Sequence, residues 1–222
     1  MARLFGELGV VAYELAGPGD LSMLLPAERA ATETFVDGRK LQYAAGRSCA
    51  RAGLADLGFD ARPLLSGHDR RPLWPAGAEG SISHTDGFCV AISARTSELA
   101  GRGIGVDTEQ HGRVRPELFA KLFTASELSA LEDRAPTDRA LAATIMFSAK
   151  EAFYKAQYPR SEAWVSFTDV EIELPMPAAG GCAGRAHRAT ELAALDLVRW
   201  PVAVGVDVRP GVVITAVVVE PA

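Results

Sequence analysis

Apolar residues recur at helical spacing in two long segments of the chain. The first covers residues 38–58 and has Gly58 as a suitable stop. The second covers residues 137–157 and ends before Pro159, because proline interrupts helix hydrogen bonding. The apolar stripe of the first segment consists of Leu41, Ala45, Cys49 and Ala52. We therefore predict one long helix in each half of the chain.

Short runs rich in β-forming residues follow each predicted helix. They cover residues 81–94 and 103–110 in the first case, and 164–174, 199–208 and 211–220 in the second. Pro210 and Gly211 predict a turn between the last two runs. Residues 61–80 and 177–190 have the composition of loops, and the first 37 residues give no assignment.

The order of these segments predicts an α+β fold made of two similar halves. Each half has a long helix followed by strands, which indicates a faint internal duplication with pseudo-twofold symmetry. We expect an N-terminal half over residues 1–103 and a C-terminal half over residues 104–222. A cleft between the halves is a common place for a ligand.

Composition excludes several classes of protein. The chain has 222 residues, 48% hydrophobic and 23% charged, which is ordinary for a globular protein. Its net charge of −5 gives no general attraction to nucleic acid or anionic membranes, so we expect neither as a partner. The N-terminus lacks the apolar core of a signal peptide, and no apolar run is long enough to span a membrane. Three cysteines without metal-ligand spacing indicate buried thiols in a reducing cytoplasm.

Two acids stand at the end of the predicted strand GIGVDTEQ. Asp107 and Glu109 are two residues apart, so on a strand both side chains point to one face, together with Gly105. The glycines at 103 and 105 are expected to leave room for a ligand. An alternative interpretation is a pair of solvated acids at a strand end.

The second candidate element is FSAKEAFYKA, residues 147–156. On a helix, Glu151 and Lys155 lie one turn apart, and Lys150 is adjacent in sequence. Taken alone, this pattern is also that of an exposed ion pair. Asp107, Glu109 and Glu151 together offer three hard oxygen ligands suited to Mg²⁺, and the two lysines can neutralise phosphate oxygens. The combination is typical of phosphoryl transfer.

Basic residues and a histidine in the first half are candidates for binding an anion. His84 ends the sequence SISH after Ser83, and Arg47 lies one turn from Arg51 on the first predicted helix. The other candidates are Arg39, Arg70 and Arg71. A structural histidine and a solvated arginine stripe remain alternatives. Neither a G-x-x-x-x-G-K-[ST] loop nor a G-x-G-x-x-G helix start is present, so those nucleotide-binding folds are not expected.

These motifs resemble the paired signature of 4′-phosphopantetheinyl transferases. GIGVDTEQ fills the pattern (V/I)G(I/V)D-x-E, and FSAKEAFYK fills (F/W)-(S/C/T)-x-K-E-(A/S)-x-x-K. SISHTDGF is similar to a third family segment, and GRSCAR and PLWPAGAEGSISH resemble the long, surfactin- and enterobactin-associated type with its actinobacterial relatives. That type is monomeric and serves polyketide and non-ribosomal peptide carriers. The resemblance covers about residues 36–175.

The resemblance implies an activity and a role for each motif residue. The family moves phosphopantetheine from coenzyme A to a serine of an apo acyl or peptidyl carrier protein, with Mg²⁺ or Mn²⁺. Asp107, Glu109 and Glu151 would hold the metal, with Glu151 also the general base. Lys155 and Lys150 would contact the pyrophosphate, and His84 and Ser83 the phosphates of coenzyme A. Arg39 and Arg47 would hold the adenine nucleotide. Trp164 would line the pantetheine arm. Relatives often carry a lysine where this chain has Ser66, so Arg70 or Arg71 is expected to substitute.

Two other functions remain open at this point. One is a different Mg²⁺-dependent phosphoryl or nucleotidyl transferase using the same acids, which would not release 3′,5′-ADP. The other is a non-catalytic module that binds coenzyme A or a carrier protein, against which the intact acids and lysines argue. The carrier and the pathway are not fixed by the sequence.

Overall fold

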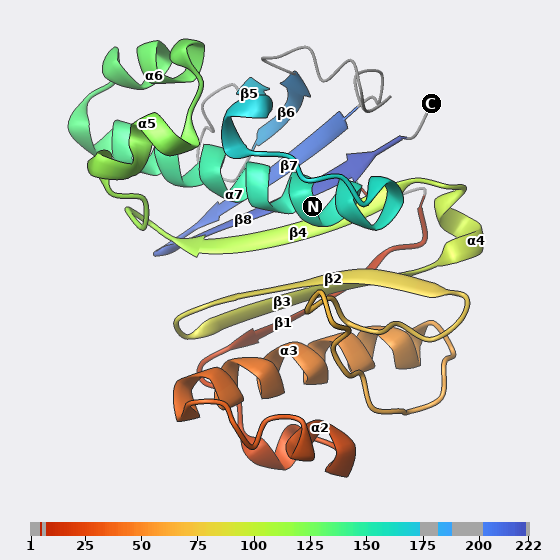
Figure 1. Cartoon of the computed structure of the whole chain (residues 1–222). Helices are drawn as coiled ribbons and strands as arrows, with labels where there is room; N and C mark the ends of the chain where they lie inside the picture. Colours follow the sequence, from red (N-terminus) through yellow and green to blue (C-terminus); the bar gives the residue numbers. More distant parts are fainter. Residues whose placement is uncertain (1–4, 6–7, 174–181, 188–201, 221–222) are drawn as a thin grey trace. The chain divides into compact units, whose positions relative to one another are not determined.

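The computed structural model describes residue 5 and residues 8–173, 182–187 and 202–220, and it divides into two compact units (Figure 1). The N-terminal unit comprises Phe5–Ala100, and the C-terminal unit begins at Gly101. Each unit combines helices with an antiparallel sheet, so the α+β fold class predicted from the sequence is confirmed. No helix in the described part of the chain is long and apolar enough to cross a membrane.

The N-terminal unit packs one long helix against a three-stranded sheet. The helix is α3, Asp37–Asp56, and the sheet has the order β1-β3-β2. The remaining elements are β1 (Val11–Ala16), η1 (Leu21–Met23), α2 (Pro26–Ala30), β2 (Ala78–Thr85), β3 (Phe88–Arg95) and α4 (Thr96–Leu99). Ala45, Cys49 and Ala50 of α3 form a buried cluster with Cys89 and Ala91 of β3. Ala45 and Cys49, two of the four residues of the apolar stripe predicted for this helix, therefore face its sheet.

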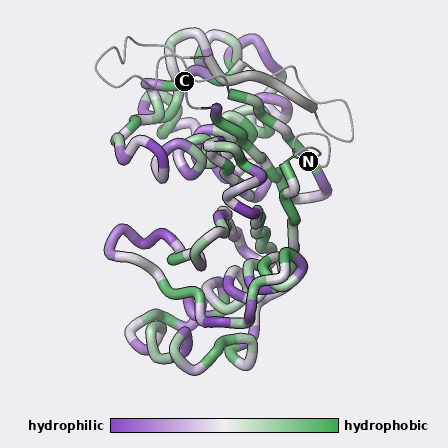
Figure 2. Tube along the Cα trace, turned by 90° about the vertical axis from the view of Figure 1, so that its right-hand side faces the viewer, coloured by the Kyte–Doolittle hydropathy of each residue, from purple (hydrophilic) through white to green (hydrophobic). Residues whose placement is uncertain are grey.

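The C-terminal unit packs a longer helix, α7 (Pro136–Ser161), against a five-stranded sheet of order β4-β8-β7-β6-β5. Its strands are β4 (Gly103–Gln110), β5 (Glu171–Glu173), β6 (Cys182–His187), β7 (Val202–Arg209) and β8 (Val212–Val219). Its short helices are η2 (Pro116–Leu118), α5 (Phe119–Leu122), α6 (Ala125–Glu132) and η3 (Phe167–Asp169). Hydrophobic stretches follow the strands of this unit in Figure 2, and β8 is buried along nearly its whole length.

The two units share one order of elements. In each, a first strand pairs antiparallel with the last strand of a hairpin: β1 with β3, and β4 with β8. In each, the long helix lies in sequence between the first strand and that hairpin, which is β2–β3 or β7–β8. This repeated topology supports the internal duplication that the sequence indicates.

Several predicted elements differ from the structure. Residues 81–94 are not one strand, because Asp86 and Gly87 turn the chain between β2 and β3, and Gly87 has φ 73°. The predicted loop 177–190 contains strand β6 over Cys182–His187, while its other residues lie outside the described part. The first 37 residues include β1, η1 and α2.

The long C-terminal helix also passes Pro159 instead of ending before it. Pro159 is in the last turn, where proline costs a single helical hydrogen bond. Arg160, the next residue, donates to the carbonyl oxygens of Gly101 at 3.0 Å and Arg102 at 2.7 Å. These bonds anchor the final turn, so the helix continues to Ser161.

Candidate active site

The glycines of β4 let α7 approach the strand at backbone distance. A Cβ atom at Gly105 would lie 2.0 Å from the carbonyl oxygen of Ala152, and one at Gly103 would lie 2.1 Å from that of Ala156. The glycines were expected to leave room for a ligand, and that prediction is wrong, since helix backbone fills the space. The close approach instead brings the polar residues of α7 to the acidic end of β4.

Lys155 of α7 forms an ion pair with Asp107 of β4. Its Nζ donates to Asp107 Oδ1 at 2.7 Å and to the carbonyl oxygen of Val106 at 3.2 Å. Asp107 is buried, with 5% of its side chain exposed, whereas Lys155 keeps 26% exposed. The strand signature and the helix signature therefore meet in one place within the C-terminal unit.

Glu109 and Glu151 belong to the same electrostatic cluster. Burial, followed by the charge of Asp107, raises the pKa of Glu109 to about 7, while Arg113 and Lys155 oppose the change. Burial also raises the pKa of Glu151, against the lowering effect of Lys155. The charge of Asp107 thus adds to the effect of burial on the pKa of both glutamates, and Lys155 offsets only part of it.

The donor set suits a hard divalent cation. Three carboxylates with excess negative charge are the chemistry that Mg²⁺ prefers, and a cation would counter both the burial and the neighbouring charge that raise the pKa values of Glu109 and Glu151. In the conformation described, no group of three or more His, Cys, Asp or Glu side chains among the described residues is arranged to hold a metal. Lys155 holds one oxygen of Asp107 instead. The assignment of Asp107, Glu109 and Glu151 as metal ligands stays a prediction.

Lys150 has a different environment from the one expected of a phosphate ligand. It is 3% exposed and donates to Glu127 Oε2 at 2.5 Å and to the carbonyl oxygens of Leu122 at 3.0 Å and Phe167 at 2.7 Å. Burial lowers the pKa of Lys150, while Glu127 acts to raise it. Three acceptors satisfy the three donors of the ammonium group. The structure therefore places Lys150 in a buried ion pair that joins α7 to the segments around α6 and η3.

Trp164 borders a pocket of about 240 Å³ next to the acidic cluster. Its side chain is 77% exposed and meets Tyr154 edge-on, with 5.7 Å between ring centroids. Glu151 lines the same pocket, as do Phe153, Val165 and Phe167. A mostly apolar hollow with a carboxylate at its wall suits a flexible chain that ends in a reactive polar group.

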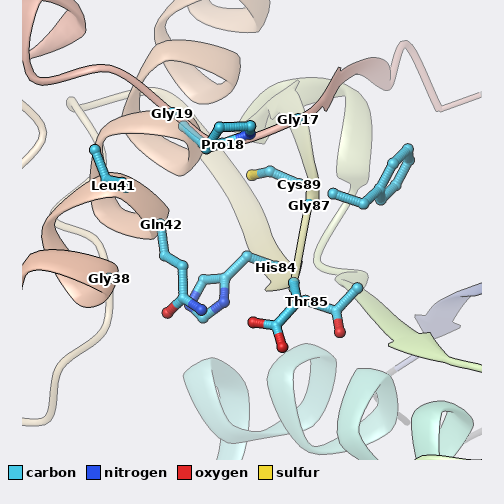
Figure 3. Close-up of a pocket in the computed structure, with 13 residues that line it drawn as sticks. Gly17, Pro18, Gly19, Gly38, Leu41, Gln42, His84, Thr85, Gly87 and Cys89 are labelled. Atoms are coloured by element: carbon cyan, nitrogen blue, oxygen red, sulfur yellow. The ribbon is translucent and has the colours of Figure 1, made fainter.

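In the N-terminal unit, Arg39 of α3 forms a hydrogen bond with His84 Nε2 of β2. Ser83 is buried beside His84. Figure 3 shows His84 at the edge of a pocket of about 190 Å³, together with Gln42 and Leu41 of α3 and the glycines at 17, 19, 38 and 87. The structure thus brings together Arg39 and His84, two of the residues predicted to bind coenzyme A.

Arg47 and Arg51 are not the solvated stripe considered as an alternative. Arg47 is 6% exposed. Its Nε donates to the Leu64 carbonyl oxygen at 2.6 Å, and its Nη2 donates to Ser66 Oγ at 2.8 Å. Its Cζ lies 4.1 Å from the centroid of the Tyr43 ring. Burial lowers its pKa. Arg51 binds Glu28 at 2.7 Å, so its predicted contact with the cofactor competes with a structural ion pair.

The loop that follows α3 contains the other two arginines. Arg70 is exposed at its tip with φ 67°, and Arg71 pairs with Asp69. Arg47 reaches Ser66, the position where relatives often carry a lysine. Arg70 and Arg71 thus lie in the same loop as Ser66, as the substitution hypothesis requires.

Two important residues were missed in the sequence. Glu28 and Glu127 are both buried, at 0% and 2% exposed, and each pairs with a cation of a long helix. The T-x-x-E sequence from Thr124 to Glu127 is a capping-box signal and marks the start of α6. No comparable sequence signal marks Glu28.

Comparison with known proteins assigns both units to one family. Residues 27–94 match the family model of the 4′-phosphopantetheinyl transferase N-terminal domain, and residues 103–209 match that of the 4′-phosphopantetheinyl transferase superfamily. The chain is 35% identical over 169 residues to 4′-phosphopantetheinyl transferase Svp of Streptomyces mobaraensis, covering 73% of this chain and 66% of that protein.

Two further similarities concern a second relative and a solved structure. The chain is 32% identical over 160 residues to 4′-phosphopantetheinyl transferase PptT of Mycobacterium tuberculosis, covering 70% of this chain and 67% of the relative. A holo-(acyl-carrier-protein) synthase from Bacillus anthracis, in complex with CoA (3′,5′-ADP), aligns with TM-score 0.41 and 21% identity over 54% of this chain and 96% of that one. The matches thus span about two thirds of the two curated relatives. With both family models matched in order and both signature motifs intact, the chain belongs to the 4′-phosphopantetheinyl transferase superfamily.

Proposed function

We propose that this protein transfers 4′-phosphopantetheine from coenzyme A to a serine hydroxyl of an apo acyl or peptidyl carrier protein and releases 3′,5′-ADP. The meeting of the two signatures supports this most strongly: β4 provides Asp107 and Glu109, and α7 provides Glu151 and Lys155 in ion-pair contact with Asp107. The relatives named 4′-phosphopantetheinyl transferases support the same reaction.

The residues of this cluster have separable tasks. Bound by Asp107, Glu109 and Glu151, Mg²⁺ would supply positive charge to the pyrophosphate, and Mn²⁺ is expected to substitute. Glu151 lines the pocket beside Trp164 and would accept the proton of the attacking serine hydroxyl. Lys155 keeps a quarter of its side chain exposed and would stabilise charge that grows on the pyrophosphate.

Each unit provides candidate residues for binding the donor. His84, with Arg39 beside it, and Arg47 would bind phosphate groups of coenzyme A, with Ser83 near them. Arg70 and Arg71 would add positive charge from the loop after α3. The pocket bordered by Trp164 would take the pantetheine arm, and its apolar wall suits that uncharged chain.

The test is the intact mass of a panel of apo-carriers after incubation with the protein, coenzyme A and Mg²⁺. The expected result is a mass gain of one phosphopantetheine on a single serine, with an equal amount of 3′,5′-ADP released. Transfer of another phosphate-containing group would favour a different phosphoryl or nucleotidyl transferase. Coenzyme A binding without any modified carrier in the panel would favour a non-catalytic binding module.

A further inference from the structure

Glu28 and Arg51 form a buried clamp in the N-terminal unit. Glu28 is 0% exposed, and its two oxygens accept from Arg51 Nη1. Arg51 Nη2 also donates to the carbonyl oxygen of Met23, just before α2. The Leu25 N–H donates to Glu28 Oε2 at 3.0 Å. The clamp therefore joins the middle of α3 to the start of α2.

The C-terminal unit repeats this construction. Glu127 of α6 and Lys150 of α7 are 23 residues apart, the same separation as Glu28 and Arg51. Glu127 accepts from the Thr124 N–H, as Glu28 does from the Leu25 N–H. Lys150 binds the carbonyl oxygen of Leu122, two residues before Thr124. Arg51 likewise binds that of Met23, two residues before Leu25. Because the same arrangement occurs in both units, we infer that each buried pair is a structural feature of its unit and not a chance pairing of surface charges.

In each unit the clamp also holds the chain that follows the long helix. Glu127 Oε1 accepts from the Ile172 N–H at 2.7 Å, and Glu28 Oε1 accepts from the Leu64 N–H at 2.9 Å. Leu64 is fully buried. Its peptide is thus fixed by a carboxylate that is itself fixed by Arg51.

The next polar contact along this peptide belongs to Arg47. The Leu64 carbonyl oxygen accepts from Arg47 Nε at 2.6 Å and from the Tyr43 hydroxyl at 3.3 Å. Arg47 Nη2 continues to Ser66 Oγ. The Nε and Nη2 contacts set the plane of the guanidinium. The orientation of the Arg47 side chain therefore depends on where Leu64 lies.

Leu64 also begins the loop that contains the exposed arginine. The Leu73 N–H donates to the Leu65 carbonyl oxygen at 2.8 Å, and the Gly67 N–H donates to that of Arg71 at 2.8 Å, so residues 65–73 form a narrow turn. Ser66 and Pro72 form a β-bridge within it. The clamp thus fixes the base of the turn whose tip is Arg70.

We propose that Glu28 and Arg51 are positioning residues for donor recognition: through the Leu64 peptide they orient Arg47 and the turn 65–73 toward the phosphate groups of coenzyme A. This inference rests on the proposed function. Arg51 accordingly acts through Glu28 and does not contact the cofactor, in place of the direct contact predicted from the sequence. Orienting a buried guanidinium before the donor binds removes part of the cost of ordering it.

The test compares coenzyme A with dephospho-coenzyme A as donors for the double variant Glu28→Gln/Arg51→Met. Replacing both charges avoids leaving one buried and unpaired. We expect KM for coenzyme A to rise about tenfold, the equivalent of one lost charge-assisted contact, with kcat within about twofold of native. The preference for coenzyme A over dephospho-coenzyme A should fall by a similar factor. In an Arg47→Ala background the double substitution should shift this preference by less, because only the effect through the turn 65–73 remains.

Two other variants separate positioning from general loss of stability. Leu99→Ala empties a fully buried site of the same unit, in α4 and outside the buried cluster that contains Leu64, and it should lower the unfolding midpoint while leaving the donor preference native. Arg51→Lys keeps the charge but is shorter and has one nitrogen in place of Nη1 and Nη2. It should therefore loosen the contacts with Glu28 and Met23 and shift the preference in the same direction by less, even if the double variant does not fold.

The outcomes distinguish this inference from the function on which it rests. A native protein that transfers phosphopantetheine, with an unchanged donor preference in Arg51→Lys and in the double variant, would overturn the inference alone. So would a shift that persists undiminished without Arg47. A native protein that neither transfers nor binds coenzyme A, as measured by calorimetry, would overturn both.

Discussion

Gly105 of β4 and Ala152 of α7 are in backbone contact, so closely that a Cβ atom on the glycine would lie 2.0 Å from the alanine carbonyl oxygen. The distance between strand and helix is therefore set by backbone atoms. Lys155 follows Ala152 by three residues, and the same contact brings its Nζ to 2.7 Å from Asp107 Oδ1. The geometry of the site thus depends on a glycine with no chemistry of its own.

We expect Gly105→Ala to destabilise the protein and to lower its activity together. The added methyl group must push α7 away, because backbone cannot move aside as a flexible side chain can, and overpacking of this kind costs about 1–3 kcal/mol. The shift would also separate Lys155 from Asp107. Urea unfolding and initial transfer rates measure the two effects. Native stability and native rates of Gly105→Ala would contradict the packing argument.

Lys150→Met should act mainly on stability. It leaves Glu127 buried at 2% exposure without its cation, and breaking a buried pair in this way costs about 3–5 kcal/mol. The double variant Glu127→Gln/Lys150→Met should recover much of that loss. Denaturant midpoints of the single and double variants test this. A stable Lys150→Met protein with a greatly raised KM for coenzyme A would restore the phosphate-binding role predicted from the sequence.

The sequence predicted the elements whose determinants are local. Strand β4 was assigned over 103–110, the residues it occupies, because its acids alternate with apolar residues. The turn at Asp86–Gly87 was missed although Asp-Gly between apolar runs is a hairpin signal, since its two strands were interpreted as one. Helix α7 passes Pro159 because Arg160 binds carbonyl groups far away in sequence.

The structure brings together the three acids singled out in the sequence but only one of the two lysines. Asp107 and Lys155 do meet, as two separately recognised motifs implied. Lys150 could not be separated from Lys155 by sequence, because its role depends on Glu127, which lies 23 residues earlier and becomes a partner only after folding. The glycines of β4 were also ambiguous, since room for a ligand and room for a helix require the same residue.

Removal of divalent metal should abolish transfer without unfolding the protein. As the proposed ligands, the three carboxylates would bind a cation that offsets their charge, and loss of several kcal/mol of charge stabilisation corresponds to a rate loss of roughly a hundredfold or more. Excess chelator, followed by return of Mg²⁺ or Mn²⁺, measures the effect, with circular dichroism to confirm the fold. Asp107→Asn should remain inactive when metal is returned. Full turnover in excess chelator would rule out the metal requirement.

Glu151→Gln should lose chemistry while still binding coenzyme A. Glutamine keeps the shape of the side chain but cannot accept the serine proton, and a positioned general base contributes about 10²–10⁴ in rate. We therefore expect kcat to fall within that range while calorimetry in the presence of Mg²⁺ still detects coenzyme A. Near-native kcat would place the base elsewhere in the site.

Lys155→Met should lower kcat more than it raises KM for coenzyme A. The ammonium group is partly exposed and bound to Asp107 in the free protein, so it is available to charge that grows on the pyrophosphate as the bond breaks. Interactions made mainly in the transition state appear in kcat, and a preorganised donor of this kind contributes about 10²–10³.

The substitution also removes the counter-ion of the buried Asp107, so part of any loss could come from stability. Unfolding midpoints and the double variant Asp107→Asn/Lys155→Met separate the two, because the double variant removes the unpaired charge but cannot restore the rate. Lys40→Met, which removes a lysine paired only with the exposed Asp37, should keep native kinetics. If Lys155→Met instead raised KM with kcat unchanged, the lysine would serve donor binding and the proposed division of work between Glu151 and Lys155 would be wrong.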